Sequence, residues 1–127
     1  MSRSMSPTEE IIMQCLWESG EDLTVYEITE RLRTQYQRDY TNSAVATFMK
    51  SMLEKGMVTR FKVHHSYQWH PEIDMDEYRD RETDAFLDLW HHGSKSSMLA
   101  SLLRDTDISE EELQEMRELL DEYSDQA

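Results

Sequence analysis

The sequence has few of the residues from which several common functional sites are built. Its 127 residues include one cysteine, Cys15, which excludes an intrachain disulfide framework and a cysteine-cluster metal site. Three glycines are too few for a glycine-rich phosphate loop, and no Ser/His/Asp arrangement is recognisable among the many carboxylates. We therefore expect a protein that is not an enzyme.

Long apolar runs are also missing. No stretch approaches the roughly 20 apolar residues that a membrane span needs. The N-terminus lacks the apolar core of a secretory signal peptide. We therefore expect a cytoplasmic protein with no membrane partner.

Histidine is present, but its arrangement does not favour a metal site. His64, His65 and His70 are close in sequence, and His91 and His92 form a second pair. Adjacent residues of a strand point to opposite faces, so neighbouring histidines do not easily chelate one ion. No set of His, Asp and Glu shows the i, i+4 helical spacing of a zinc enzyme. The sequence predicts no metal site and no cofactor.

Basic residues are scarce, since 13 Lys and Arg stand against 27 Asp and Glu, for a net charge of -14. Such a charge repels nucleic acid, but its distribution is uneven. Residues 1–71 hold 8 basic and 9 acidic side chains, whereas residues 72–127 hold 5 and 18. Within residues 23–70 there are 7 basic and 4 acidic side chains. The excess of basic side chains in this segment favours contact with DNA. An ordinary solvated protein surface is the alternative explanation of the same excess.

Capping signatures predict three helices in the first part of the chain. Residues 6–9 (SPTE) combine a serine cap, a proline in the first turn and a glutamate three residues after the cap. Residues 24–27 (TVYE) repeat the signature and predict a second helix that reaches about Gln37. A third helix follows Thr41 and closes before Gly56. Each has apolar side chains at three- and four-residue spacings, which predicts one buried stripe per helix.

Two short extended runs follow the third helix at once. They cover residues 57–63 and 67–70, are joined at residues 64–66, and end at Pro71. Polar and apolar residues alternate in both runs, so we expect one face of the ribbon to pack on the helices and the other to meet solvent or DNA. Two helices joined by a short turn, then a two-stranded ribbon, are typical of a winged helix-turn-helix.

The composition turns acidic after Pro71, where three further helices are predicted. They total about fifty residues, which is small for an independent core, so we expect their apolar side chains to be buried against a second chain. The alternative is that they fold back on the first domain of the same chain. The sequence thus predicts a winged-helix domain at 1–72 and a helical dimerisation domain at 73–127. The residues expected at the dimer interface are Tyr78, Phe86, Leu89, Trp90, Leu99, Leu102, Leu113, Met116 and Leu120.

The order of these motifs resembles the penicillinase-repressor family of bacterial winged-helix regulators (the BlaI/MecI/CopY type) along nearly the whole chain. Each motif is weakly specific alone, whereas their order and spacing are more specific. The matching segments are MQCLWESG (13–20), TVYEI (24–28), VATFM (45–49), LEKG (53–56), YQWHP (67–71), GS (93–94) and SEEEL (109–113).

The resemblance implies a mainly α protein with a small β-wing, which acts as a homodimeric repressor on double-stranded DNA with a palindromic operator. The chain departs from the family in four places. Family members often carry Arg where this chain has Ser51, and Gly-Arg where it has residues 64–65, which implies fewer phosphate contacts here. The C-x-C motifs of the copper-responsive members are absent. Antibiotic-responsive members are cleaved at an Asn-Phe bond where this chain has Ser101-Leu102, so an inducer or protease stays unidentified.

Candidates for DNA contact lie on the third helix, off its apolar stripe, and in the wing. The N-terminal half of such a helix enters the major groove, where Asn42 suits an adenine, Thr47 a thymine methyl, and Lys50 a phosphate or guanine. Thr41 serves first as the helix cap. The wing residues are expected at phosphates. The full set is Thr41, Asn42, Ser43, Ala46, Thr47, Lys50, Arg60, Lys62, His64 and His65.

Two functions from different classes follow from these patterns. The first is a dimeric DNA-binding transcriptional regulator that acts as a repressor. The second is a protein-interaction module on a winged-helix scaffold, with the acidic C-terminal part as its docking surface. Binding to palindromic DNA that weakens with salt would separate the two.

Overall fold

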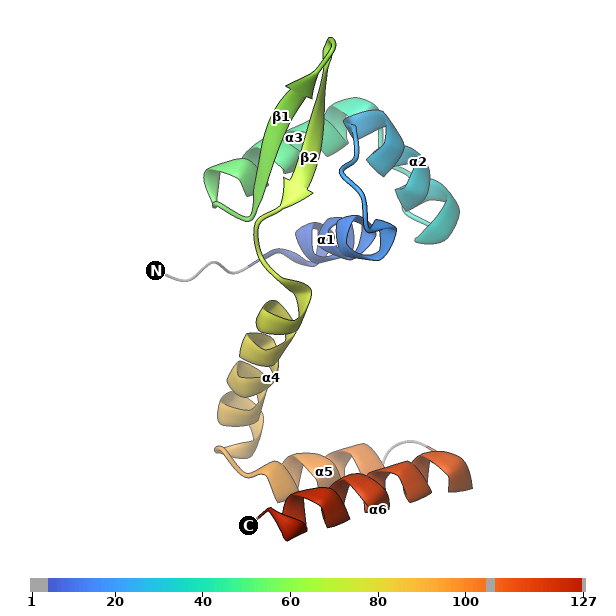
Figure 1. The fold of residues 1–127 in the computed structure, drawn as a ribbon, viewed down its shortest axis with the longest axis vertical. Helices are drawn as coiled ribbons and strands as arrows, with labels where there is room; N and C mark the ends of the chain where they lie inside the picture. Colours follow the sequence, from blue (N-terminus) through green and yellow to red (C-terminus); the bar gives the residue numbers. More distant parts are fainter. Residues whose placement is uncertain (1–4, 105–106, 127) are drawn as a thin grey trace. The chain divides into compact units, whose positions relative to one another are not determined.

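The fold is mainly helical, with one two-stranded antiparallel sheet, as the sequence predicts. The computed structural model describes residues 5–104 and 107–126 (Figure 1). The elements in chain order are α1 (Pro7–Ser19), α2 (Val25–Gln35), α3 (Asn42–Glu54), β1 (Val58–Val63), β2 (Ser66–Pro71), α4 (Met75–His91), α5 (Lys95–Arg104) and α6 (Glu110–Asp125).

The helices begin where the capping residues predict. The Ser6 hydroxyl accepts a hydrogen bond from the Glu9 amide at 3.2 Å, and the Glu9 carboxylate accepts one from the Ser6 amide at 2.9 Å. Thr24 and Glu27 repeat this capping box at the start of α2. The predicted end of α2 near Gln37 is wrong, because Gln37 has a φ of 52° and the helix stops at Gln35.

One hydrophobic core holds α1, α2, α3 and the wing together. Its side chains come from one face of each of the three helices and from the wing, and Leu23 joins them from the segment before α2. Leu23 and Trp69 exchange two backbone hydrogen bonds, at 3.2 and 2.8 Å, which attach the segment before α2 to β2. The fully buried residues are Ile12, Met13, Leu16, Leu23, Ile28, Leu32, Met49, Met52, Met57, Val45, Val58 and Cys15.

The wing does not have the single apolar face that its alternation suggests. The register pairs Arg60 with Trp69 and Lys62 with Tyr67, and directly paired residues of an antiparallel sheet share a face. Trp69 is buried, while Phe61, on the opposite face, is 44% exposed. The basic residues of β1 therefore lie beside the aromatic residues of β2, which corrects the expectation of one apolar and one polar face.

The N-terminal compact unit ends within α4, at Arg79. Trp17 on α1 donates a hydrogen bond from Nε1 to the carbonyl oxygen of Ile73 at 2.9 Å. The Tyr78 hydroxyl donates to the Glu10 carboxylate at 2.9 Å, and its ring lies 6.1 Å from that of Trp17. Tyr78 is thus buried within the N-terminal unit, whereas the other residues expected at a dimer interface belong to the second unit.

The second compact unit covers residues 80–127. In its described part, α5 and α6 have no buried residue. Leu99, Met116, Leu119, Leu120 and Tyr123 line an apolar groove of about 250 Å³. Phe86, Leu89, Trp90, Leu102 and Leu120 are each about half exposed or more, while Leu99, Leu113 and Met116 are half-buried.

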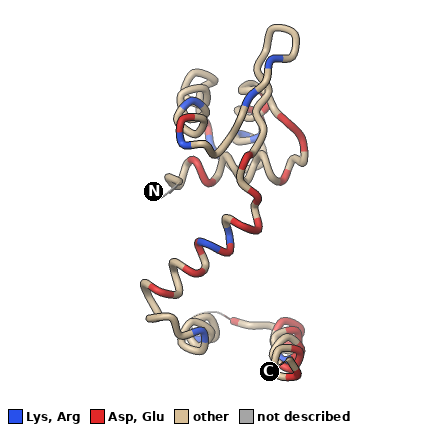
Figure 2. Tube along the Cα trace, turned by 60° about the vertical axis from the view of Figure 1, so that its left-hand side comes forward, with Lys and Arg blue, Asp and Glu red and all other residues tan. Residues whose placement is uncertain are grey.

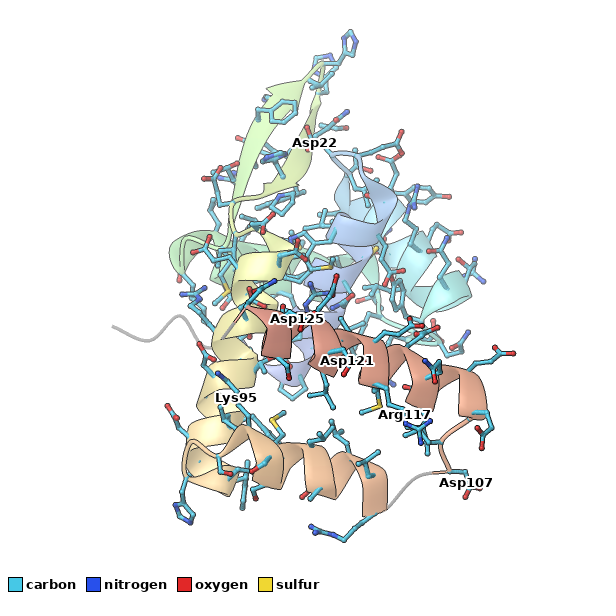
Figure 3. All side chains as sticks on the ribbon, turned by 60° about the horizontal axis from the view of Figure 1, so that its bottom comes forward. Asp22, Lys95, Asp107, Arg117, Asp121 and Asp125 are labelled. Carbon is cyan, nitrogen blue, oxygen red and sulfur yellow. The ribbon has the colours of Figure 1, made fainter. Side chains whose placement is uncertain are left out.

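Arg117, Asp121 and Asp125 lie at four-residue spacings along α6 (Figure 3). Acidic residues are frequent along α4 and α6, and basic residues mark the wing (Figure 2).

Within residues 5–104 and 107–126, no helix combines the length and apolar character that a membrane span requires.

Candidate nucleic-acid interface

Helix α3 separates a buried face from an exposed one. Val45, Met49 and Met52 are buried against the core. Thr41 caps the helix, since its hydroxyl accepts from the Ala44 amide at 3.1 Å. The residues predicted to contact DNA lie on the other side: Thr41, Asn42, Ser43, Thr47 and Lys50 are exposed, and Ala46 is half-buried.

The Thr47 side chain has its hydroxyl hydrogen engaged within α3. Its Oγ1 donates to the carbonyl oxygen of Ser43 at 3.1 Å. This back-bond is common for threonine within helices. The hydroxyl oxygen and the methyl group remain for outside contacts, and the methyl group suits an apolar partner such as a thymine methyl.

Ion pairs divide the basic side chains of the N-terminal unit into two sets. Lys55 pairs with Glu9 at 2.8 Å, Arg33 with Glu30 at 2.8 Å and Arg31 with Glu21 at 3.6 Å. Within the described residues, no carboxylate lies within ion-pair distance of the three other cations on α3 and the wing. These three cations are Lys50, Arg60 and Lys62, all of which belong to the predicted DNA-contact set.

The wing cations are supported by aromatic rings. The Arg60 guanidinium lies 4.2 Å from the centre of the Tyr67 ring and 5.5 Å from that of Trp69. The Lys62 ammonium lies 5.9 Å from the Tyr67 ring centre. A ring face attracts a cation without neutralising its charge. The contacts therefore restrain Arg60 and leave its charge for an external anion.

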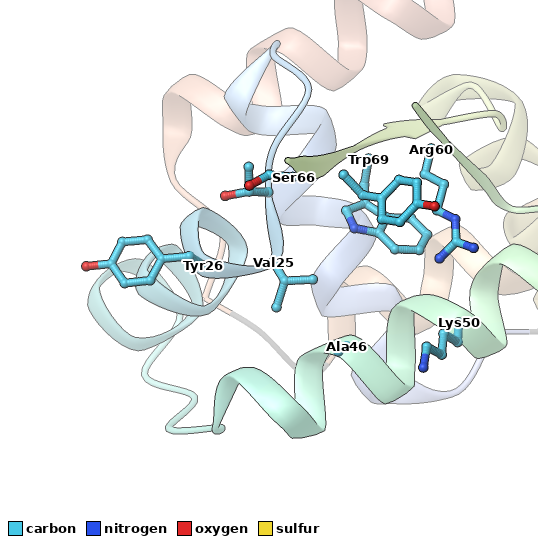
Figure 4. Close-up of a pocket in the computed structure, with 9 residues that line it drawn as sticks. Val25, Tyr26, Ala46, Lys50, Arg60, Ser66 and Trp69 are labelled. Atoms are coloured by element: carbon cyan, nitrogen blue, oxygen red, sulfur yellow. The ribbon is translucent and has the colours of Figure 1, made fainter. Parts of the chain in front are cut away.

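A cavity brings α3 and the wing together. Ala46 and Lys50 come from α3, and Arg60 and Tyr67 come from the two strands (Figure 4). Three predicted site residues, two from α3 and one from β1, thus lie around one space. His64 and His65 lie farther along the ribbon, in the two-residue turn at its tip, where both are exposed. His64 has a φ of 58°, in the left-handed region.

Glu9 and Cys15 are among the titratable groups of the N-terminal unit whose pKa values are shifted. Burial alone would raise the pKa of Glu9, but hydrogen bonds from Lys55 and Ser6 and the charge of Lys55 lower it overall. Glu9 therefore stays ionised and neutralises Lys55. Burial raises the pKa of the Cys15 thiol to about 11, so this thiol is an inert core group.

Two features of the site were missed by reasoning from the sequence. Tyr26 is 64% exposed on the first turn of α2 and lines the cavity. The Trp69 Nε1 atom is buried without a hydrogen-bond partner among the described residues. The position of Tyr26 off the apolar stripe of α2 was a usable signal for its exposure, whereas no neighbouring residue in the sequence indicates that the Trp69 nitrogen lacks a partner.

Within the described ranges, no group of three His, Cys, Asp or Glu side chains is placed to hold a metal ion.

Comparisons with known proteins identify relatives that match most of the chain. The chain is 24% identical to the penicillinase repressor of Bacillus licheniformis over 119 residues, which cover 94% of this chain and 91% of the relative. It is 22% identical to the methicillin resistance regulatory protein MecI of Mammaliicoccus sciuri over 86 residues, covering 68% and 70%. It is 19% identical to the penicillinase repressor of Staphylococcus aureus over 120 residues, covering 94% and 93%.

The sequence model of one protein family also matches. Its description is Penicillinase repressor, and the match covers residues 5–122, from the residue before the α1 cap to within α6. The match spans the winged helix and the C-terminal helices alike. The chain therefore belongs to the penicillinase-repressor family, whose members are DNA-binding regulators and not enzymes.

Proposed function

We propose that the protein is a cytoplasmic transcriptional repressor that binds a palindromic operator as a homodimer. The observation that carries the DNA-binding part is the exposed polar face of α3 beside Lys50, Arg60 and Lys62, which have no carboxylate partner among the described residues. An α-helix of this kind fits the major groove, and neighbouring cations neutralise phosphates. The names of the relatives, penicillinase repressor and methicillin resistance regulatory protein, support repression as the outcome.

The α3 residues suggest what kind of operator is bound. The exposed face of α3 has no arginine, so bidentate guanine recognition by arginine is not available from it. Asn42 suits an adenine edge, and Thr47 and Ala46 suit thymine methyls. We therefore expect half-sites rich in A·T, related by the two-fold axis of a dimer.

The dimerisation part of the proposal comes from the second unit. Its helices α5 and α6 bury none of their described residues, and Phe86, Leu89 and Trp90 are exposed. Exposed apolar surface of this extent is typical of protein interfaces. A second copy of the same helices would bury it, and a two-fold dimer would present two α3 helices to two half-sites.

Binding to random DNA followed by sequencing of the retained fragments tests the proposal. The expected result is a palindromic, A·T-rich consensus whose affinity falls steeply with salt. A consensus that is G·C-rich and lacks two-fold symmetry would contradict both the α3 assignment and the dimer. Absence of any salt-dependent DNA binding would favour the alternative of a protein-interaction module, which the comparisons do not support.

A further inference from the structure

The cavity between α2, α3 and the wing has features beyond those that DNA contact needs. Its volume is about 390 Å³, within the size range of small-molecule sites. Apolar groups form much of its wall, including Val25, Ala46 and the rings of Tyr67 and Trp69. These apolar groups would not stabilise a bound phosphate or chloride ion. The wall instead suits a flat apolar body.

The same cavity carries two positive charges in a protein whose net charge is -14. Lys50 enters it from α3 and Arg60 from β1 (Figure 4). Neither side chain has a carboxylate partner within the part of the chain that the structure describes. Two cations next to an apolar wall attract an anion more strongly than they would in open water.

A buried donor completes the site. Trp69 is 3% exposed, and its Nε1 has no acceptor in the described ranges, whereas Nε1 of Trp17 donates to Ile73. Buried donors without an acceptor are rare in folded proteins. The nitrogen edge of the Trp69 ring lies toward the Val25 side of the cavity, away from Arg60 (Figure 4). A ligand that reaches from the cations to this edge needs an acceptor atom at its far side.

We propose that this cavity binds a small aromatic carboxylate that also carries a hydrogen-bond acceptor on its ring. The carboxylate lies between Lys50 and Arg60, the ring lies against Tyr67, Trp69 and Val25, and the acceptor takes the indole hydrogen of Trp69. Contact with that hydrogen requires the surrounding side chains to move, because the Trp69 Nε1 atom is covered in the free protein. The occupied cavity withdraws Lys50 and Arg60 from DNA phosphates. This last consequence rests on the proposed repressor function, while binding itself does not.

The binding test uses 6-hydroxy-2-naphthoate as the probe, because its hydroxyl oxygen lies across the ring system from its carboxylate, and the full-length protein labelled with ¹⁵N. The three indole signals report on three different environments, since Trp17 is hydrogen-bonded in the core, Trp69 lines the cavity and Trp90 is exposed. The expected result is a saturable shift of the Trp69 indole signal with a dissociation constant of roughly 1 mM, as for other ligands of this size. The Trp17 and Trp90 signals should stay in place.

Matched controls separate charge recognition from general adsorption. The neutral analogue 6-(hydroxymethyl)-2-naphthol should bind at least about fivefold more weakly, because it cannot pair with the cations. Lys50→Gln and Arg60→Gln should each weaken naphthoate binding about fivefold. Lys62→Gln should leave the binding unchanged, because Lys62 is on the same ribbon but does not line the cavity. An unshifted Trp17 signal in each variant shows that the fold is intact.

Three results would overturn the proposal. They are an unmoved Trp69 signal at saturating probe, equal affinity for the neutral analogue, and equal affinity in the Lys50, Arg60 and Lys62 variants. A separate titration of DNA complexes should show DNA release in proportion to the occupancy measured by the Trp69 signal. Failure of the ligand-free protein to bind DNA would contradict the proposed repressor function and leave the binding result standing.

Discussion

The Lys55 ammonium at the end of α3 lies 2.8 Å from Oε1 and 3.1 Å from Oε2 of Glu9, in the first turn of α1. Glu9 is 3% exposed and also accepts hydrogen bonds from the Ser6 amide and the Ser51 hydroxyl. One carboxylate thus caps α1 and fastens α1 to the end of the helix proposed to read DNA. Lys55, a basic residue of the locally positive segment, is used in this contact within the fold.

The first prediction concerns how much the Glu9–Lys55 ion pair stabilises the fold, and how that contribution changes at acidic pH. The pKa of Glu9 is lowered in the folded protein, so the pair contributes stability above the ordinary glutamate pKa, and this contribution is lost as the pH falls through the lowered value. Glu9→Gln should lower the free energy of unfolding by about 1–2 kcal/mol at pH 7, because Lys55 keeps part of its hydration. The stability of the Glu9→Gln variant should also depend less on pH between about 5 and 3 than the stability of the parent protein does.

Urea unfolding of both proteins at several pH values measures this difference. Glu54→Gln is a suitable control, since Glu54 is an exposed neighbour of Lys55. Equal pH dependence in Glu9→Gln and the parent protein would refute a structural role for the ionised carboxylate.

A second prediction concerns the salt dependence of DNA binding. Lys50→Gln, Arg60→Gln and Lys62→Gln should each weaken binding to all DNA sequences alike. Each lost phosphate contact should reduce the slope of log K against log salt by roughly 0.9. Arg33→Gln is the matched control, because Arg33 pairs with Glu30. If the slope in all three lysine and arginine variants at these positions equals that of the parent protein, these cations do not face DNA.

The third prediction separates the two ends of the Thr47 side chain. The hydroxyl hydrogen is engaged by Ser43, so base contact is expected from the methyl group. Thr47→Ser removes the methyl group and should cost on the order of 1 kcal/mol per half-site at one symmetric thymine position. Thr47→Val keeps a methyl group and should retain the preference. Binding titrations with thymine and uracil at that position measure both, and the reverse order would assign the contact to the hydroxyl.

The fourth prediction concerns the groove between α5 and α6. Leu120→Glu places a charge in this apolar surface and should convert the proposed dimer to a monomer at micromolar concentration, with a large loss of operator affinity. Gln114→Glu adds the same charge on another side of α6 and should leave the dimer intact. Sedimentation equilibrium measures both. A parent protein that sediments as a monomer would refute the dimer itself.

The fifth prediction concerns the turn at the tip of the wing. His64 has a φ of 58°, which glycine adopts with less strain than histidine. His64→Gly should therefore raise the free energy of unfolding by up to about 1 kcal/mol. His65→Gly should not stabilise the protein, because His65 does not have a positive φ. Thermal unfolding of the two variants compares them directly, and greater stability of His65→Gly would contradict the turn geometry.

Local stretches of the amino-acid sequence are enough to predict where most helices begin and which helical faces are buried. The caps Ser6, Thr24, Thr41 and Ser109 act on amides three residues away, so their effect is contained in a few consecutive residues. The stripes of α1, α2 and α3 follow from helical periodicity, which is also local. The winged-helix pattern and the resemblance to the family could therefore be recognised from the residues and their spacing.

Contacts between distant residues depend instead on the tertiary structure. Alternation within each strand could not give the register that places Arg60 beside Trp69, because register depends on the pairing of two strands. Nor could it show that Lys55 is held by Glu9, or that Tyr78 belongs to the N-terminal unit through Glu10. These contacts join residues 46 and 68 positions apart, and their geometry is set by packing of the whole unit and not by neighbours in the chain.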